Sequence, residues 1–380
     1  MKKYNITIAL FLLILFVFSC KPKHVETSQN NESSKIISTS YPKYAKGFHI
    51  EYYDNYKILE LINPWDTTRI MYRYLLIPKG MKNIPRVPES VIIETPINSI
   101  ACLFTTQLAF IKKLGVTNKL TGMSRIEYVK DSTIRDRIEK GEIIQFGEPE
   151  NPDSEKLIAI DPDILMVSPF RDNKYQHIES AGIPLAVNGS YMEATPLGRA
   201  EWIKFVAYFF EMENDANQIF NEIEKQYLEV KNKVEDVDSK PSIFTGRKFS
   251  QVWHVVGNNS YMANYLKDAG FDYIWKDLDF YGSVPYEFES VYEKAAHADY
   301  WSFIEYNEAE IRYSHIKKDF SSYADFDAFK NKQIIICNSK ETPYFENGIL
   351  EPHLVLSDFV KVAHPDILPD YKPKYFKLLK

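Results

Sequence analysis

The amino-acid sequence predicts an α/β protein in which two similar lobes with parallel sheets are joined by one long helix. Strand and helix patterns alternate from residue 91 onward, and such alternation favours parallel sheets. The order strand, helix ending at glycine, strand, helix carrying a glutamate, acidic turn and strand occurs twice, before and after a central apolar helix. A chance coincidence of α/β patterning is the alternative. The matching places of the two glutamate-bearing helices favour a repeated plan.

The central helix is predicted over residues 195–210, within a linking segment assigned to residues 191–213. Thr195 offers a hydroxyl that caps free N–H groups, and Pro196 already holds the φ of a first helical residue. A helix of this length spans roughly 24 Å at about 1.5 Å per residue, which is enough to connect two small lobes. An ordinary packed helix is the alternative. The apolar stripe of the predicted helix follows helical spacing and consists of Trp202, Phe205, Val206 and Phe209.

Residues 1–19 have the layout of a signal peptide. Two lysines precede an apolar run over residues 6–18 that is too short to span a bilayer. Ser19 directly precedes Cys20, and this resembles the processing site of a bacterial lipoprotein, in which Cys20 is acylated and becomes the first mature residue. A plain secretory signal with an incidental cysteine is the alternative.

The remaining chain divides by composition and pattern. Residues 20–39 are rich in Lys, Ser, Asn, Glu and Thr and predict a flexible tether. Residues 40–90 contain short alternating runs separated by turn formers, which predicts a β-rich appendix. The N-terminal lobe is assigned to residues 91–190 and the C-terminal lobe to residues 214–380.

Charge and cysteine usage exclude some classes of function. A net charge of −6 and a pI near 5.9, without a basic stripe interleaved with aromatic residues, argue against a nucleic-acid partner. Besides Cys20, the chain has Cys102 and Cys337, which lie in strand-like runs of different lobes and are expected to be core residues. The sequence lacks Cys-x-x-Cys, His-x-His and His-x-x-x-His spacings, so no dedicated metal site is predicted.

Several stretches in this order resemble one known family. They include the Pro-Leu-Gly-Arg-Ala-Glu-Trp run and His364-Pro365-Asp366, and they cover most of residues 90–370. The chain resembles a class III substrate-binding protein of ABC transporters, of the ferric-siderophore, haem and cobalamin type, in its lipoprotein branch. The matching stretches are residues 105–115, 153–167, 195–210, 253–270, 288–301 and 351–368.

The resemblance implies two Rossmann-like lobes with a ligand cleft between them. It implies a monomer without catalysis or a cofactor, which captures a metal chelate or corrinoid and delivers it to an ABC permease. The expected location is the periplasmic face of a Gram-negative envelope membrane, through the N-terminal lipid. One glutamate on each lobe is expected to dock on permease arginines. By position these are Glu155 and Glu289, with Glu287 as a rival for the second.

The ligand-binding residues are expected in loops after the parallel strands, because the carboxyl ends of those strands face the cleft. Arg171 and Arg247 suit carboxylate or catecholate oxygens, and Trp253 suits a flat ligand face. Phe104 stands where the resemblance implies a small polar residue, which favours a more apolar ligand surface. The candidates are Phe104, Thr105, Thr106, Arg125, Phe170 and Arg171 in the first lobe and Arg247, Trp253, His254, Asn258, Asn259, Ser260 and Tyr281 in the second.

Two other functions are compatible with parts of the sequence pattern. An enzyme or metallochaperone of related shape, such as a chelatase, would need a convergent histidine and acidic pair, whereas only His254 is suitably placed, and a cluster scaffold would need several cysteines. A surface or periplasmic recognition lipoprotein without a dedicated permease is the other rival. Loss of transport on substitution of Glu155 and Glu289 would separate it from the importer component.

Overall fold

The computed structural model describes residues 35–172 and 174–380, and its first strands form a mixed sheet of their own. The strands pair in chain order; the first four are antiparallel, and the fifth runs parallel to the fourth. Cys20, the predicted signal peptide and most of the predicted tether lie outside the described residues. The strands are β1 (Ser38–Ser40), β2 (Phe48–Tyr52), β3 (Lys57–Ile62), β4 (Ile70–Pro78) and β5 (Ser90–Thr95).

This sheet begins earlier and ends later than the predicted appendix. Residues 38 and 39, assigned to the tether, pair with β2 together with Ser40. The strand after residue 90, assigned to the N-terminal lobe, is β5 and pairs with β4. A short strand pattern does not identify its partner, because pairing is decided by which neighbours cover its faces. Here Ile93 of β5 joins the buried core.

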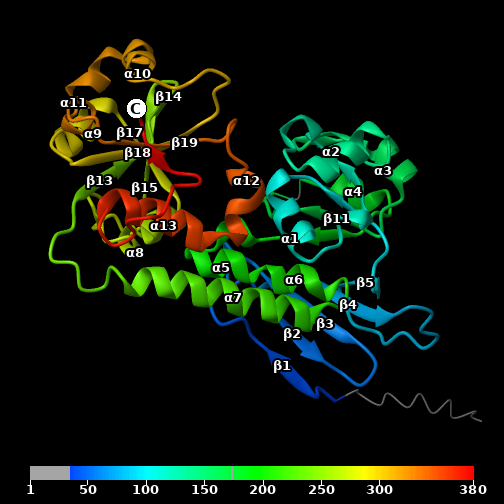
Figure 1. The fold of residues 1–380 in the computed structure, drawn as a ribbon. Coiled ribbons are helices and arrows are strands. Elements are labelled where there is room, and N and C mark those ends of the chain that lie inside the picture. The colour runs from blue at the N-terminus through cyan, green and yellow to red at the C-terminus, as the bar shows by residue number, and fades with distance from the viewer. Residues whose placement is uncertain (1–34, 173) are drawn as a thin grey trace, which may run out of the picture. The chain divides into compact units, whose positions relative to one another are not determined.

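The N-terminal lobe contains a parallel sheet in the order β12-β11-β6-β7-β8 (Figure 1). The order places β6 at the centre, with its three residues fully buried. Its strands are β6 (Ile100–Cys102), β7 (Leu120–Met123), β8 (Ile144–Gln145), β11 (Ile164–Val167) and β12 (Leu185–Val187), beside the short pair β9 (Gly147–Glu148) and β10 (Asn151–Pro152). Its helices are η1 (Thr105–Gln107), α1 (Leu108–Lys113), η2 (Thr117–Lys119), η3 (Ile126–Tyr128), α2 (Ser132–Glu139), α3 (Ser154–Ile160), α4 (Gln176–Ser180) and η4 (Ser190–Met192).

The C-terminal lobe repeats this plan with the order β16-β13-β18-β19-β20, in which only the last strand is antiparallel. A separate antiparallel sheet has the order β14-β15-β17. The strands are β13 (Ser242–Thr245), β14 (Lys248–Phe249), β15 (Val252–Val256), β16 (Asp272–Tyr273), β17 (Ser283–Tyr286), β18 (Tyr300–Glu305), β19 (Ile334–Asn338) and β20 (Lys377–Leu378). The helices are α8 (Tyr261–Asp268), α9 (Phe288–Ala295), α10 (Tyr313–Asp319), η5 (Ser321–Asp325), α11 (Asp327–Lys330), α12 (Tyr344–Asn347), η6 (Gly348–Leu350) and α13 (Pro352–Ala363).

Both lobes use the acidic turn in the same way. Asp163 Oδ2 accepts from the Ser99 backbone N–H at 3.0 Å, and the Asp163 N–H donates to Ser99 Oγ at 2.9 Å. In the second lobe, Asp299 Oδ2 accepts from the Ser242 N–H at 2.8 Å, and the Asp299 N–H donates to Ser242 Oγ at 2.9 Å. The predicted repeat therefore extends to individual hydrogen bonds, and the predicted two-lobe α/β fold is confirmed.

The predicted linking helix is present but is interrupted at one residue. The segment forms two short helices, α5 (Pro196–Glu201) and α6 (Ile203–Tyr208), which are separated at Trp202. The Trp202 N–H donates to the Arg199 carbonyl three residues back, as in a 3₁₀ turn. The indole is fully buried and packs so closely on Gly189 that a Cβ there would lie 2.9 Å from the ring. The tighter turn accompanies this close packing of the indole.

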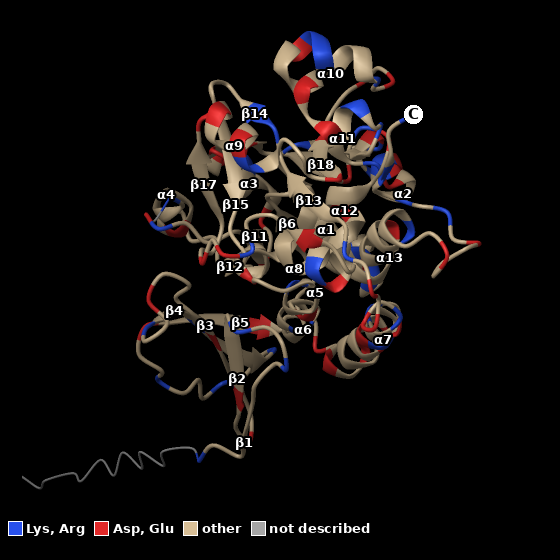
Figure 2. Cartoon of the chain, turned by 90° about the vertical axis from the view of Figure 1, so that its left-hand side faces the viewer, with Lys and Arg blue, Asp and Glu red and all other residues tan. Residues whose placement is uncertain are grey.

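A longer helix, α7 (Glu213–Asn232), follows α5 and α6 along the chain. Helix α7 packs along α5, α6 and α13, and it carries both acidic and basic side chains (Figures 1 and 2). The predicted helix near residues 215–234 is therefore present, but it packs against the linking helices as well as the C-terminal lobe. Among the described residues, no helix has the length and apolar character needed to cross a membrane.

Two buried glutamates attach the start of the chain to the linker. Glu201 is fully buried and accepts from the backbone N–H groups of Lys43, Tyr44 and Ala45 at 2.7–3.0 Å. Glu193 accepts from the next two, those of residues 46 and 47, and from the Trp202 indole N–H at 3.0 Å. Five consecutive backbone donors are thereby satisfied, which allows this segment to be buried.

Candidate ligand-binding cleft

The strand ends of both lobes meet at one cavity of about 800 Å³. Phe104 and Thr105 follow β6, and Arg125 follows β7, so the N-terminal lobe contributes two adjacent strand ends. From the C-terminal lobe, Tyr306 follows β18, and the segment 339–346 follows β19. Carboxyl ends of neighbouring parallel strands lie at one edge of a sheet, which is where ligands bind in such folds. The cavity has the size and position expected for a small-molecule site.

Aromatic rings from opposite lobes face one another in this cavity. Tyr128 and Tyr306 form an edge-to-face pair with centroids 5.7 Å apart, although their side chains remain 40% and 47% exposed. Phe345 also lines the cavity and is 46% exposed. Exposed rings on both walls offer large, rigid contact area for the organic surface of a ligand.

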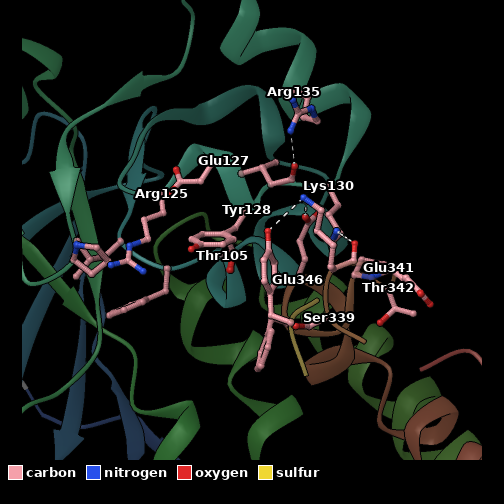
Figure 3. A pocket seen from close by; sticks show the side chains of 18 of the residues that line it. Thr105, Arg125, Glu127, Tyr128, Lys130, Arg135, Ser339, Glu341, Thr342 and Glu346 are labelled. Atoms are coloured by element: carbon pink, nitrogen blue, oxygen red, sulfur yellow. Dashed lines mark hydrogen bonds between the residues drawn. The ribbon is translucent and has the colours of Figure 1, made fainter. Parts of the chain in front are cut away.

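The two ends of the cavity differ in charge pairing, as Figure 3 shows for Arg125 at one side and Lys130 with Arg135 at the other. Arg125 Nε lies 2.6 Å from Glu148 Oε2, and its Nη2 lies 3.4 Å from Glu150 Oε2. Lys130 Nζ donates to the carbonyl of Lys340, and Arg135 Nη1 donates to the Val129 carbonyl at 3.0 Å. Arg125 is thus already paired with carboxylates, whereas Lys130 and Arg135 bond to carbonyls.

A buried carboxylate joins the lobes at the back of the cavity. Glu346 of α12 is 3% exposed, and its Oε1 lies 2.8 Å from Lys112 Nζ of α1. Its Oε2 accepts from the Lys130 backbone N–H at 2.7 Å. Lys112 Nζ also contacts Asn347 Oδ1 at 2.8 Å and Asp131 Oδ2 at 3.1 Å. These contacts hold α12 against the N-terminal lobe.

The structure separates the predicted ligand residues into three cavities. Phe104, Thr105 and Arg125 line the large cavity, whereas Thr106 is exposed outside it. Phe170 and Arg171 line a cavity of about 200 Å³ beside β4. The remaining cavity, of about 340 Å³, is lined by Asn259, Ser260 and Tyr281 together with Tyr191 and Arg199.

Other predicted residues lie away from these cavities. Arg247 is held by Glu305 at 2.7 Å and by Asp319 at 3.3 Å. His254 is exposed on β15 and pairs with Pro285 of β17. Asn258 Nδ2 donates to the Lys276 carbonyl.

Trp253 is a clear correction. Its indole is fully buried, and its Nε1–H donates to the Thr245 carbonyl at 2.9 Å, so no ring face is available to a ligand. The prediction placed Trp253 in a loop after a parallel strand, but Trp253 lies within β15, which belongs to the antiparallel sheet. The ring instead packs on Phe244 and Trp301 in the core.

The two candidate docking glutamates occupy equivalent places. Glu155 is exposed in the first turn of α3, and Glu289 is exposed in the first turn of α9. Glu287 is also exposed, at the N-cap of α9. The cap of α3 is made by Asp153, which accepts from the Lys156 N–H at 3.1 Å, so Glu155 is not needed to start that helix.

Sequence reasoning missed the residues that give the large cavity its character. Tyr306 and the segment 339–346 follow β18 and β19, and the strand-end rule applied to those strands would have found them. Tyr128 and Lys130 are different, because they lie in a 3₁₀ turn and the loop after it, beyond the end of β7. No local pattern marks such residues.

A family model described as a periplasmic binding protein matches residues 100–341. The chain belongs to this family. The expected class, substrate-binding components of ABC transporters, is thereby confirmed, as is the expectation that the protein is not an enzyme. Members of the family are solute-binding proteins that act outside the cytoplasm and deliver small molecules to ABC permeases.

Curated relatives and solved structures agree with this assignment. Two uncharacterized lipoproteins of Methanocaldococcus jannaschii are 28% and 22% identical to the chain; they are matched over 99% and 93% of this chain and over 96% and 90% of their own. A Helicobacter pylori protein with Ni(II) bound has a TM-score of 0.58 at 15% identity, covering 74% of this chain and 88% of its own. A Staphylococcus aureus protein complexed with heme has a TM-score of 0.55 at 14% identity, covering 70% and 98%. At these identities the solved structures show a shared fold.

Proposed function

We propose that this periplasmic binding protein is lipid-anchored and captures a metal chelate, an iron-siderophore or cobalamin-like molecule, for an ABC importer. The observation that carries the proposal is the cavity of about 800 Å³ built by strand ends of both lobes, with aromatic and cationic side chains on its walls. Such walls suit an organic ligand that carries polar oxygen atoms. The heme and Ni(II) complexes among the similar structures support a metal-containing cargo.

The ligand is identified on protein purified from its own host. Native mass spectrometry and absorption spectroscopy would detect a bound chelate, and titration with candidate iron chelates, haem and cobalamin would follow. A saturable increase in melting temperature with one of these compounds supports the proposal. A protein that none of them stabilises or binds would contradict it.

The tyrosine pair should be a large part of the binding surface. Replacing both Tyr128 and Tyr306 by Ala is expected to weaken binding of the chelate by roughly 10-fold or more, because removing one favourable aromatic contact costs about 0.5–1.5 kcal/mol beyond the buried area. Isothermal titration measures the change. The matched control replaces Tyr41, which is 69% exposed and stacks on His49 far along the sequence from the cavity residues. Equal affinities for the control and the double variant would remove the pair from the site.

The anchor is tested at Cys20, which lies outside the described residues. Replacing Cys20 by Ala is expected to abolish incorporation of labelled fatty acid and to release the protein from the membrane fraction, because the proposed lipid is attached through the side chain of this residue. Unchanged labelling would show that Cys20 is not the modified residue. The two similar lipoproteins come from an archaeon, so the proposal specifies only an extracytoplasmic membrane face. The periplasmic face of a Gram-negative cell is the narrower expectation, which cell fractionation tests.

The alternative is a recognition lipoprotein for a metal chelate without a dedicated permease. The exposed first-turn positions of Glu155 and Glu289, one on each lobe, favour the importer component. A cellular uptake experiment on variants of these two residues separates the alternatives.

A further inference from the structure

Within the large cavity, cationic side chains from both lobes converge at one side. Lys130 comes from the N-terminal lobe and Lys340 from the C-terminal lobe, and the Lys130 ammonium donates to the Lys340 carbonyl oxygen. Arg135 lines the same side (Figure 3). Lys340 Nζ in turn lies 3.4 Å from the hydroxyl of Tyr306, so this side adjoins the aromatic pair.

The carboxylates around this side have other cations as partners. Glu346 is buried and held by Lys112 at 2.8 Å, whereas Glu341 lies 3.3 Å from Lys377 in an exposed and therefore weak pair. Lys340 has one exposed carboxylate partner, Glu308 at 3.1 Å, which is 79% exposed and therefore a weak partner in water. The ion pairs formed among residues 35–172 and 174–380 do not include Lys130 or Arg135. Glu127 lies toward Arg125 (Figure 3).

The environment of Lys130 is unfavourable for a charge. Burial lowers the pKa of Lys130 below its usual value, and the charges of Lys340 and Arg135 lower it further, while the carboxylate of Glu346 acts in the opposite direction. A like charge placed against a partly buried ammonium costs free energy unless an anion neutralises it. An oxygen anion between the two ammonium groups would remove that cost and would gain charge-assisted hydrogen bonds from both lobes.

We propose that Lys130 and Lys340, with Arg135 beside them, form an anion subsite that binds negatively charged oxygen atoms of the ligand. The inference rests on the proposed function and narrows it: the cargo is an anionic chelate, of the catecholate or carboxylate kind, rather than a neutral or cationic one. The subsite contacts the ligand from both lobes, and the aromatic pair lies beside it.

The test uses two iron(III) chelates of opposite charge type, a tricatecholate complex, which is an anion, and a linear trihydroxamate complex, which is not. Wild-type protein is expected to bind the tricatecholate at least about tenfold more tightly. Replacing Lys130 or Lys340 by Met is expected to weaken tricatecholate binding about tenfold or more and to leave trihydroxamate binding unchanged. The matched control is Lys317→Met, an exposed lysine on α10 outside this cavity.

Two readouts distinguish a ligand contact from a structural role. The melting temperature of the unliganded Lys130→Met protein should stay close to that of wild type, because the substitution removes one of two crowded like charges. Tricatecholate affinity of wild type should fall as pH rises through the lowered pKa of Lys130, since the ammonium is lost, and this dependence should be absent in Lys130→Met. Inorganic phosphate should compete only weakly, since it lacks the rings that contact the tyrosines.

The outcomes separate this inference from the proposed function. Tight tricatecholate binding by both Lys→Met variants, or equal affinity of wild type for the two chelates, would overturn the anion subsite. Either result would leave the proposed chelate-binding function intact. Strong competition by phosphate alone would show a free-anion site and also overturn the inference. Binding of neither chelate, nor of haem or cobalamin, would overturn the proposed function and the subsite with it.

Discussion

Replacing Glu201 by Gln is expected to destabilise the fold by about 3–5 kcal/mol, the cost of breaking a buried charged network. Glu201 Oε1 accepts from the Lys43 N–H at 2.9 Å and lies 2.7 Å from Lys204 Nζ, while Oε2 accepts from two further backbone N–H groups. A glutamine has one acceptor oxygen, so its NH₂ group must face two donors in either orientation. The two donors that face the NH₂ group would then lose their acceptor.

Glu193→Gln is the matched control, because all three donors meet the same oxygen of that carboxylate. The N–H groups of Lys46 and Gly47 and the indole N–H of Trp202 donate to Oε1, which the amide oxygen of Gln replaces. Urea denaturation should show a lower midpoint for Glu201→Gln and little change for Glu193→Gln. Coincident midpoints for the two variants would show that the donors of residues 43–45 contribute nothing to the fold.

The same control carries a pH signature. Burial raises the pKa of Glu193 above its usual value, so the folded state binds this proton more tightly than the unfolded state does. Between the unfolded and the raised folded pKa, the contribution of Glu193 to stability must therefore decrease as pH rises. Glu193→Gln should remove that decrease, which a series of urea midpoints on the alkaline side of the unfolded pKa would detect.

The second large effect is expected in transport. Replacing Glu155 and Glu289 together by Ala should reduce uptake of the chelate by 10-fold or more, because losing one side of a hydrogen-bonded charge pair at an interface costs about 2–5 kcal/mol. Both side chains are exposed, and exposed charges contribute only about 0–1 kcal/mol to stability, so the melting temperature and ligand affinity should hardly change. Uptake, melting and titration are measured on the same variants.

Two further variants sharpen this experiment. Glu139→Ala with Glu229→Ala removes two other exposed helical glutamates and should leave uptake intact. Glu155→Ala with Glu287→Ala tests the neighbouring carboxylate at the N-cap of α9. Normal uptake in all three double variants would favour the recognition lipoprotein without a permease. Lost ligand affinity in the first would place these residues in the ligand site instead.

The predicted ligand residues show where strand-end reasoning works and where it fails. It places Phe104, Thr105 and Arg125 at the large cavity because they directly follow parallel strands. It misplaces Trp253, because a strand pattern of five residues does not reveal whether the strand joins the parallel sheet or a separate antiparallel one. That choice depends on partners distant in the sequence, as for β5.

By itself the sequence determined the two-lobe α/β plan, its central apolar segment and the positions of most strands, because alternation, glycine stops and helix caps are local properties. Only the tertiary structure decided which side chains share the cavity. Tyr128 meets Tyr306 and Lys130 meets Lys340 because two lobes fold against each other through Glu346 and Lys112. The break at Trp202 was also decided there, since the indole packs on Gly189 and is held by Glu193. Contacts between residues far apart in the chain produce no periodic pattern in the sequence, because they depend on packing that forms only in the folded protein.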